Sequence, residues 1–418
     1  MHTEPTIDRP VLIVGAGLSG LTCALRLEQE GIPYKVFEKG DRVGGRVRTD
    51  VVDGFQLDLG FQVFLTAYPE AERWLDYDRL GLGSFLPGSL VRWNGRFHMF
   101  SDPWRHPGAA VRSLLSPVGT LSDKLKMAGL RKRLGSAPYE SLLTGPDGST
   151  VEWLRSEGFS EAVIDRFFRP FLGGIFLDPE LQTSQRMFAF VFGMFARGMA
   201  ALPAEGMGAI PAQLAESLDV ARIHLGSEVV AVEDGRVRCS TGEVVDGAAV
   251  VLAGPSVASL DPEISPVATV ATSCLYFAAD EAPYRDAMLV LNGEGSGLVN
   301  NVAVLTNAAP TYSSDGRALV SVTVLKPGTD GDVVDTVRAQ LTGWWPAATG
   351  WEHLRTVEVP DALPRQWSGH LEPMERPVRL RGGRYQCGDH VDNASIQGAM
   401  VSGRRAAEAV IQDRTLAT

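Results

Sequence analysis

The sequence predicts an α/β fold in which a parallel-sheet domain of the Rossmann type carries an inserted α+β domain. Three observations carry this prediction. A buried apolar run near the N-terminus leads into a glycine-rich turn, a second such run spans residues 248–255, and a Gly-Asp pair follows a short strand pattern at 385–389. Because parallel strands in an α/β sheet are buried on both faces, apolar runs of this length are typical of them.

The N-terminal pattern combines the three parts of a dinucleotide-binding βαβ unit. Residues 11–14 (VLIV) predict the first strand, and residues 15–20 (GAGLSG) open a helical pattern. Residues 34–37 (YKVF) predict the second strand, which ends at Glu38. A strand, a glycine turn, a helix and an acid in this order form the fingerprint of a bound dinucleotide.

Each residue of this unit has a physical role. Gly15 permits the tight turn, Gly17 lets the backbone approach a pyrophosphate, and Gly20 allows close packing of helix on sheet. Backbone N–H groups at the start of the helix, at Leu18 and Ser19, point toward the phosphates. Glu38 is placed to accept hydrogen bonds from ribose hydroxyls, which disfavours a 2′-phosphate, and Lys39 beside it is included in the expected cofactor site.

A second glycine pair favours FAD over NAD. Residues 41–49 (DRVGGRVRT) follow Glu38 almost directly. Gly44 and Gly45 allow a second close backbone approach to a pyrophosphate, and Arg46 can fork onto phosphate oxygens. A plain dehydrogenase needs no such second motif, so we expect FAD.

On these motifs the chain resembles the FAD-dependent amine oxidoreductase superfamily, which includes flavin amine oxidases, protoporphyrinogen oxidases and phytoene or carotene desaturases. The pattern GRxGGRxxT is met except that Asp41 replaces its leading glycine, and residues 385–407 resemble the closing motif. The resemblance implies that Gly388 and Asp389 reach the flavin ribityl and phosphate region. It places the residues around Gln397, Gly398 and Ala399 at the flavin, the Val229 backbone at the adenine, and Gly60 and Phe61 near the isoalloxazine.

The same resemblance implies a discontinuous domain organisation. The FAD-binding domain is expected at 1–65, 205–260 and 371–418. The substrate domain is expected at 66–204, with a mostly helical pattern, and at 261–370, with β-rich runs such as 318–325.

Bulk properties exclude several classes of function. The chain has 418 residues, a formal charge of −11, and four scattered cysteines without a CxxC pair. The acidic balance makes nucleic acid an unsuitable partner. The cysteine pattern opposes a disulfide framework or zinc site and suits the cytoplasm, and the histidines lack metal-ligand spacing. No apolar stretch reaches the length of a membrane span, although peripheral membrane contact stays open.

The resemblance narrows the chemistry without naming a catalytic residue. Ser395 stands where the amine oxidases carry the second aromatic of their amine cage, and Gln397 replaces an acid. We therefore expect an FAD-dependent oxidoreductase that dehydrogenates a hydrophobic, conjugated or ring substrate by hydride transfer to flavin N5, with oxygen or a quinone as acceptor. No cysteine or tyrosine fits covalent attachment, so the FAD is expected to be noncovalent. An amine oxidase for primary amines or polyamines and a non-redox isomerase remain alternatives.

Four further features have both a functional and an ordinary interpretation. Residues 187–195 suit a substrate tunnel, but a buried helix is the favoured interpretation. Arg169 suits a substrate carboxylate, Lys326 a water at flavin N5, and His390 a flavin contact. For Arg169 we favour a helix cap or a bridge between domains. For Lys326 we favour a solvated turn residue, and for His390 a ring directed away from the flavin.

Overall fold

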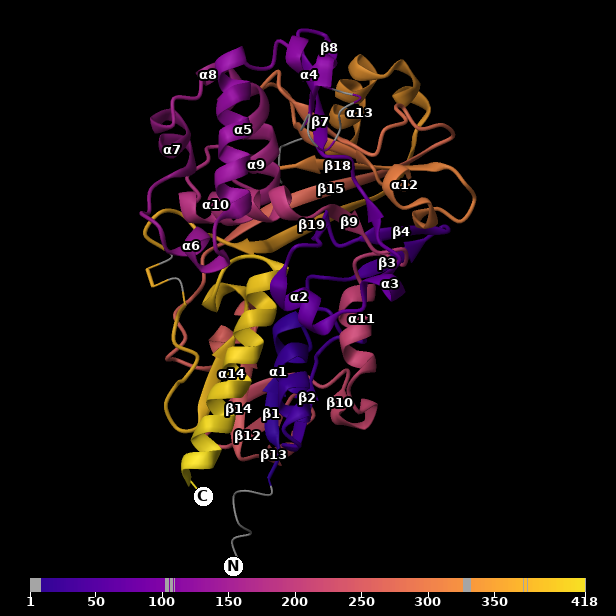
Figure 1. The fold of residues 1–418 in the computed structure, drawn as a ribbon. Helices are drawn as coiled ribbons and strands as arrows, with labels where there is room; N and C mark the ends of the chain where they lie inside the picture. Colours follow the sequence, from indigo (N-terminus) through magenta and orange to yellow (C-terminus); the bar gives the residue numbers. More distant parts are fainter. Residues whose placement is uncertain are drawn as a thin grey trace, which may run out of the picture.

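The computed structural model describes residues 9–101, 105, 108, 110–325, 332–370, 372–373 and 375–417. Lys326 therefore lies outside the described residues. Two sheets form the framework, one in each half of the molecule (Figure 1).

The parallel sheet draws its strands from separate stretches of the chain. Its order is β10-β2-β1-β14-β20, and every neighbouring pair is parallel. The strands are β1 (Val11–Val14), β2 (Tyr34–Phe37), β10 (Ile223–His224), β14 (Ala249–Ala253) and β20 (Arg384–Cys387). All residues of β1 and β14 are buried, which matches their unbroken apolar sequence.

Two helices cross closely on one face of this sheet. They are α1 (Leu18–Gln29) and α14 (Ile396–Ala417), which lie side by side in Figure 1. A Cβ atom added at Gly403 would fall 2.1 Å from the carbonyl oxygen of Ser19. The absence of that atom is what permits the close crossing and draws the C-terminal segment onto the first βαβ unit.

The second framework is a mixed seven-stranded sheet in the order β19-β15-β18-β17-β16-β7-β8. Its strands are β7 (Gly88–Trp93), β8 (Arg96–Ser101), β15 (Thr269–Ala279), β16 (Leu289–Asn292), β17 (Val299–Val304), β18 (Ala318–Val324) and β19 (Glu352–Pro364). The predicted run at 318–325 is thus a buried central strand.

The hairpin β7–β8 departs from the mostly helical pattern expected for residues 66–204. Asn94 and Gly95 form its two-residue turn, with φ of 48° and 71°. Positive φ at both positions is typical of a type I′ turn, which Asn-Gly favours. This dipeptide was the sequence signal for the hairpin, and the helical interpretation missed it.

The remaining strands make three small antiparallel units. They are β3 (Thr49–Val52) with β4 (Phe55–Asp58); β5 (Phe64–Leu65) and β6 (Gly83–Ser84) on either side of β9 (Ala200–Leu202); and β11 (Val229–Glu233), β12 (Arg236–Cys239) and β13 (Val244–Asp246).

Helices surround both sheets. In addition to α1 and α14 they are α2 (Pro69–Trp74), α3 (Tyr77–Leu80), α4 (Ala110–Leu115), α5 (Leu121–Ser136), α6 (Tyr139–Thr144), α7 (Thr150–Ser156), α8 (Glu161–Val163), α9 (Arg169–Phe176), α10 (Gln185–Arg197), α11 (Ala209–Glu216), α12 (Leu305–Ala308) and α13 (Val333–Trp344). Across the residues that the structure describes, none of them combines the length and the apolar character that crossing a membrane requires.

Candidate cofactor site

The first glycine turn leaves an open, uncapped helix N-terminus at the carboxyl edge of the parallel sheet. Gly15 has φ of +108°, and a Cβ there would lie 2.5 Å from the carbonyl oxygen of Ala253. A Cβ at Gly20 would lie 2.0 Å from the Gly15 carbonyl oxygen. A Cβ at Gly17 would meet no atom within 4 Å. Gly17 occupies the N-cap position of α1, and no side chain there bonds to the backbone N–H groups of the helix. The backbone N–H groups of Leu18 and Ser19 at this end suit a phosphate.

Glu38 lies beside this turn, at the end of β2. Its two carboxylate oxygens accept hydrogen bonds from the backbone N–H groups of Ala16 and Gly40, each at 2.8 Å. These bonds fix the carboxylate while leaving further lone pairs for ribose hydroxyls. Lys39 is exposed next to it.

The second glycine pair lies directly against the first. Gly44 N–H donates to the Ala16 carbonyl at 2.8 Å, and Gly17 and Gly44 form an isolated parallel bridge. Gly44 and Gly45 have φ of +116° and +59°, a backbone path that other residues rarely adopt. The two motifs therefore join into one backbone-lined cradle that fits a pyrophosphate.

Arg46 connects this cradle with the C-terminal motif. Its guanidinium donates to an Asp389 carboxylate oxygen at 2.6 Å and to the Ala362 carbonyl oxygen at 2.9 Å. The Asp389 side chain is 6% exposed and that of Arg46 is 32% exposed. Two nitrogens of the Arg46 guanidinium, which was expected to bind phosphate, thus donate hydrogen bonds inside the protein. The remaining N–H groups of Arg46 are available to a phosphate.

The start of α14 is shaped by Gly388, Ser395 and Gly398. Gly388 has φ of +146° and donates its N–H to the Ser402 hydroxyl at 2.8 Å. The Ser395 hydroxyl accepts from Gly398 N–H at 3.0 Å, so Ser395 caps the helix. A Cβ at Gly398 would fall 2.1 Å from the Asn393 carbonyl oxygen. Ser395 thus has a structural role at the position where the resemblance places a cage aromatic of the amine oxidases. The helix α14 begins at Ile396, so Ala399 lies in its first turn.

The side chain of Gln397 points into the protein. It is 2% exposed, accepts from the Glu70 backbone N–H at 2.9 Å, and donates to the Tyr139 hydroxyl at 3.3 Å. The side chain thus ties α14 to α2 and α6. Only the Gln397 backbone stays available for the predicted flavin contact.

Several other predicted features are placed as follows. Arg169 pairs with Asp165 at 2.9 Å and donates to the Pro179 carbonyl at 2.9 Å, so its guanidinium is bonded within its own segment of the chain. Val229 is buried in β11 opposite Cys239. Burial lowers the pKa of His390 to about 4, which keeps its buried ring neutral.

The segment 187–195 lies within α10, which packs against α5 and α6. Four of its larger side chains, Met187, Phe188, Phe190 and Met194, are buried in the main core, and Phe192 and Phe195 are partly buried against it. Tyr68 stacks on Phe190 with 5.9 Å between ring centroids. The buried-helix interpretation therefore describes these side chains, and a tunnel wall is not needed to explain them.

A buried carboxylate, Asp58, holds the two halves of the molecule together beside the cradle. It accepts hydrogen bonds from the Thr49 hydroxyl at 2.5 Å, the Met207 N–H at 2.9 Å and the Tyr312 hydroxyl at 2.9 Å. Tyr276 donates to the Asp58 carbonyl oxygen at 3.0 Å. Burial raises the pKa of the Asp58 carboxyl to about 6. Sequence reasoning did not select Asp58 as a site residue, although it lies two residues before Gly60.

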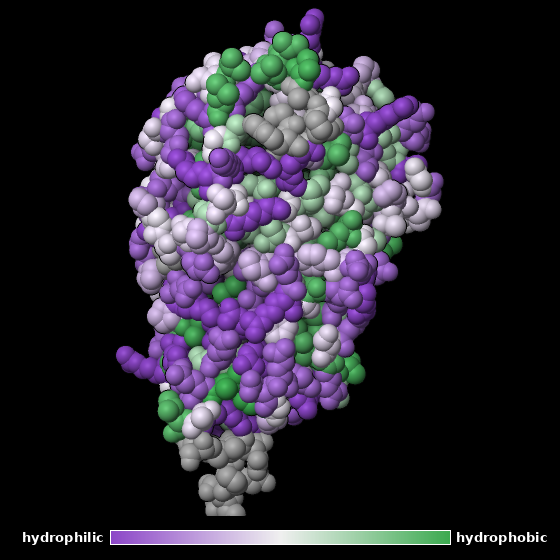
Figure 2. Space-filling view, in the orientation of Figure 1, coloured by the Kyte–Doolittle hydropathy of each residue, from purple (hydrophilic) through white to green (hydrophobic). Residues whose placement is uncertain are grey.

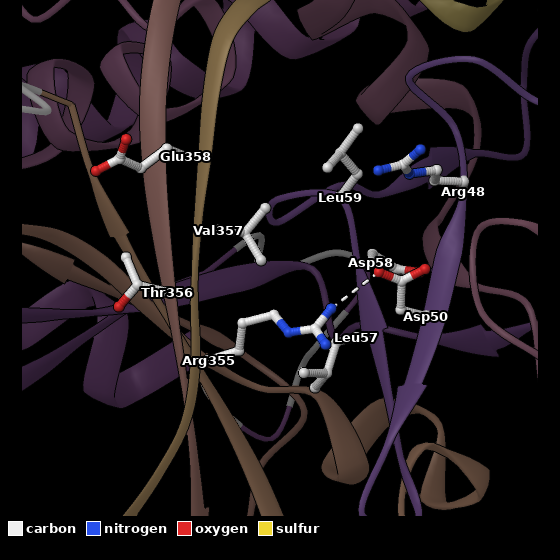
Figure 3. A pocket seen from close by; sticks show the side chains of 9 residues that line it. All are labelled: Arg48, Asp50, Leu57, Asp58, Leu59, Arg355, Thr356, Val357 and Glu358. Carbon is white, nitrogen blue, oxygen red and sulfur yellow. Dashed lines mark hydrogen bonds and ion pairs between the residues drawn. The ribbon is translucent and has the colours of Figure 1, made fainter. Parts of the chain in front are cut away.

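A cavity of about 220 Å³ opens next to Asp58, between the β3–β4 hairpin and β19 (Figure 3). The side chains of Arg355 and Val357 point into it from β19, opposite Leu59 and Arg48. Arg355 pairs with Asp50 at 2.9 Å. A Cβ at Gly60 would lie 3.6 Å from Val359 on the same strand, so the segment expected at the isoalloxazine borders this cavity.

The chain is similar to proteins of known sequence and structure. The family model for flavin-containing amine oxidoreductases matches residues 18–411. Coproporphyrinogen III oxidase of Mycobacterium leprae is 31% identical over 179 residues, which cover 40% of this chain and only 38% of that protein. The 15-cis-phytoene desaturase of Solanum lycopersicum is 23% identical over 99% of this chain and 79% of its own length.

The fold is shared with solved structures at low identity. An oxidoreductase from Methanosarcina mazei superimposes with a TM-score of 0.73 and 19% identity, over 96% of this chain and 100% of that one. This likeness confirms the predicted Rossmann-type α/β fold, and the family match confirms the resemblance drawn from the motifs. The chain belongs to the flavin-containing amine oxidoreductase family.

Proposed function

We propose that this protein uses noncovalently bound FAD to dehydrogenate a hydrophobic, conjugated or ring substrate. The observation that carries the proposal is the backbone-lined cradle of Gly17, Gly44 and Gly45. A Cβ at Gly17 would meet no atom within 4 Å, so there is open space at the N-terminus of α1. When bound, FAD supplies a two-electron acceptor at N5, from which the electrons pass to oxygen or a quinone.

The residues of this chain bind and orient the cofactor. Gly15 and Gly20 set the turn, Glu38 holds the ribose, and Arg46 with Asp389 faces the phosphate and ribityl region. Val229 contributes its backbone at the adenine. We assign Gly60, Phe61 and the N–H groups around Gly398 to the flavin ring. No side chain is assigned a proton transfer, since hydride transfer to a flavin depends mainly on positioning and exclusion of water.

Two observations favour this substrate class over amines. The Ser395 hydroxyl caps α14, so the position of a cage aromatic is filled by a small polar residue with a structural role. Relatives with matched segments are named as oxidases of a porphyrinogen and desaturases of a carotenoid. An amine needs a cage to hold its nitrogen, whereas an apolar ring or polyene needs an apolar surface.

The compartment proposed for this activity is the cytoplasm. Each of the four cysteines (Cys23, Cys239, Cys274 and Cys387) is buried and free. A chain with unpaired, scattered cysteines suits a reducing compartment.

Anaerobic bleaching of the flavin absorbance tests the substrate class. Lipophilic polyenes and porphyrinogens form one donor panel, and primary amines and polyamines form the other. We expect bleaching by the first panel alone. Bleaching by amines alone would move the protein to the amine oxidases, and turnover without net bleaching would identify an isomerase.

A further inference from the structure

The cavity beside the β3–β4 hairpin holds an arginine that no carboxylate neutralises. The cavity has a volume of about 220 Å³ and lies between the hairpin and β19, at mid-height of the molecule in Figure 1. At that height, the face drawn in Figure 2 carries hydrophilic and hydrophobic residues side by side. The Arg48 guanidinium forms no hydrogen bond or ion pair with any residue that the structure describes, and its Nε is buried. Buried donors without a partner are rare in folded proteins, so this one calls for an explanation.

The acidic side chains around the cavity are bonded to other residues or directed away from it. The Asp50 carboxylate pairs through one oxygen with Arg42 at 3.0 Å and through the other with Arg355 at 2.9 Å. The Asp58 side chain is buried, and its carboxylate accepts three hydrogen bonds from other groups. Glu358 is exposed, and Figure 3 shows its side chain pointing away from the hairpin. The unpaired arginine therefore has its charge available to a ligand.

The rest of the lining combines a second arginine with aliphatic side chains. Arg355 and Val357 point into the cavity from β19, since side chains two residues apart on a strand lie on the same face (Figure 3). Leu57 lines it from β4, and Leu59 lines it just after that strand. Guanidinium groups attract an anion, and aliphatic walls favour an apolar body. The lining thus suits a ligand that carries both.

From this lining we propose that the cavity binds the carboxylate of a short aliphatic chain, with the Arg48 guanidinium as its main partner. A planar carboxylate accepts two parallel hydrogen bonds from one guanidinium, whereas inorganic phosphate would leave the aliphatic walls unused. The volume corresponds to about seven water molecules in the liquid, so it fits a chain of about four to six carbon atoms. A free acid and the carboxylate arm of a larger molecule share this chemistry. The proposal concerns binding alone and does not rest on the proposed substrate class.

Isothermal titration calorimetry with pentanoate tests the site in the FAD-loaded protein. We expect one pentanoate per chain, and no binding of pentan-1-ol or pentylamine, because neither of these carries a negative charge. From acetate to pentanoate, each added methylene group should strengthen binding by about fourfold.

Titration with octanoate distinguishes the two sources of the carboxylate. Octanoate that binds at least as tightly as pentanoate shows that the cavity admits the arm of a larger molecule. Octanoate that binds more weakly than pentanoate assigns the cavity to a free short acid.

The variant Arg48→Met tests the main partner, because methionine keeps an unbranched apolar side chain and removes the guanidinium. Pentanoate binding should weaken by about tenfold or more, since the carboxylate loses charge-assisted hydrogen bonds. Arg285→Met is the matched control: Arg285 is exposed between β15 and β16, outside the lining, and its loss should leave binding within about twofold. Val357→Phe keeps both arginines but fills the cavity, so it should also weaken binding by about tenfold or more. Unchanged FAD absorbance and circular dichroism confirm that the variants fold.

Three results would overturn the proposal. Wild-type protein that gives no binding heat with pentanoate has no carboxylate site. Equal losses for Arg48→Met and Arg285→Met would show that Arg48 is not the partner. Pentanoate that binds only the FAD-free protein and is displaced by added FAD would assign the cavity to the cofactor.

Discussion

The cofactor cradle lies near the hydrogen-bonded group of Asp58, Thr49, Met207 and Tyr312, which we call the Asp58 junction, but the two are built in different ways. The cradle depends on side chains that are absent: Gly17 and Gly45 leave room, and backbone N–H groups face it. The junction depends on side chains that are present, because Asp58 accepts bonds from Thr49 on the neighbouring strand and from Met207 and Tyr312 in two distant segments. Changes in the cradle should therefore alter cofactor affinity, whereas changes at the junction should alter stability and its dependence on pH.

The largest effect is expected for Gly17→Leu. Gly17 has φ of −73°, and a Cβ there meets no protein atom within 4 Å, so the variant should fold. Its side chain would occupy the space of the pyrophosphate and lower FAD affinity by about a thousandfold, or about 4 kcal/mol. Fluorescence titration of the apoprotein measures this. Gly343→Leu, which also meets no atom within 4 Å, should bind FAD like the wild type; an equal loss there would mean that the cradle is not the site.

Asp58→Asn should change the pH dependence of stability rather than FAD affinity. Burial raises the folded-state pKa of this carboxyl from 3.8 to about 6. Its stabilising contribution is therefore complete below pH 3.8 and is lost as the pH rises through 6, which corresponds to about 3 kcal/mol. Asparagine cannot titrate, so the free energy of unfolding of the variant should fall less than that of the wild type between pH 4 and 7.

Denaturant unfolding at several pH values measures this difference. Asp392, whose pKa burial also raises to about 6, remains in both proteins and cancels in the comparison. Parallel pH profiles for wild type and variant would contradict the raised pKa of Asp58.

Arg46→Met tests the element that joins the cradle to the C-terminal motif. The variant leaves the buried Asp389 carboxylate without its partner at 2.6 Å and removes a donor to phosphate. We expect FAD affinity to fall by about ten- to a hundredfold, since a charge-assisted hydrogen bond contributes roughly 1.5–3 kcal/mol. Arg42→Met is the control, because Arg42 forms a more exposed ion pair with Asp50. Equal FAD affinities of the Arg46→Met and Arg42→Met proteins would contradict a contact between Arg46 and the cofactor.

The smallest effect is expected for Ser395→Ala. Loss of the hydroxyl that caps α14 should lower the free energy of unfolding by about 1 kcal/mol. The melting temperature should fall by about 2 °C, with FAD affinity nearly unchanged. A large loss of FAD affinity without a change in melting temperature would instead make Ser395 a direct cofactor contact.

The nucleotide unit could be predicted from the sequence because its determinants are local. The buried strand at residues 11–14, the glycines that follow and the acid after the second strand impose their geometry within one short stretch. Backbone constraints of this kind leave few alternatives at Gly15 and Gly20, where a Cβ would meet carbonyl oxygens. The closing strand and helix at the C-terminus were predicted from the resemblance of residues 385–407 to the family's closing motif.

The junction and the substrate half could not be predicted in the same way. Two partners of the Asp58 carboxylate, Met207 and Tyr312, are far from it in the sequence, and no local pattern links residues that lie so far apart. The burial of the Gln397 side chain against α2 and α6 likewise depends on long-range packing. The β7–β8 hairpin did have a local signal, Asn94-Gly95, which the mostly helical interpretation of residues 66–204 did not include.

FAD content and release test the cradle most directly. The purified protein should carry one FAD per chain, denaturation should release all of the yellow colour into solution, and Gly17→Leu should be colourless but folded. Colour that stays on the denatured polypeptide would contradict noncovalent binding. A yellow Gly17→Leu protein with wild-type affinity would contradict the placement of FAD in the glycine cradle.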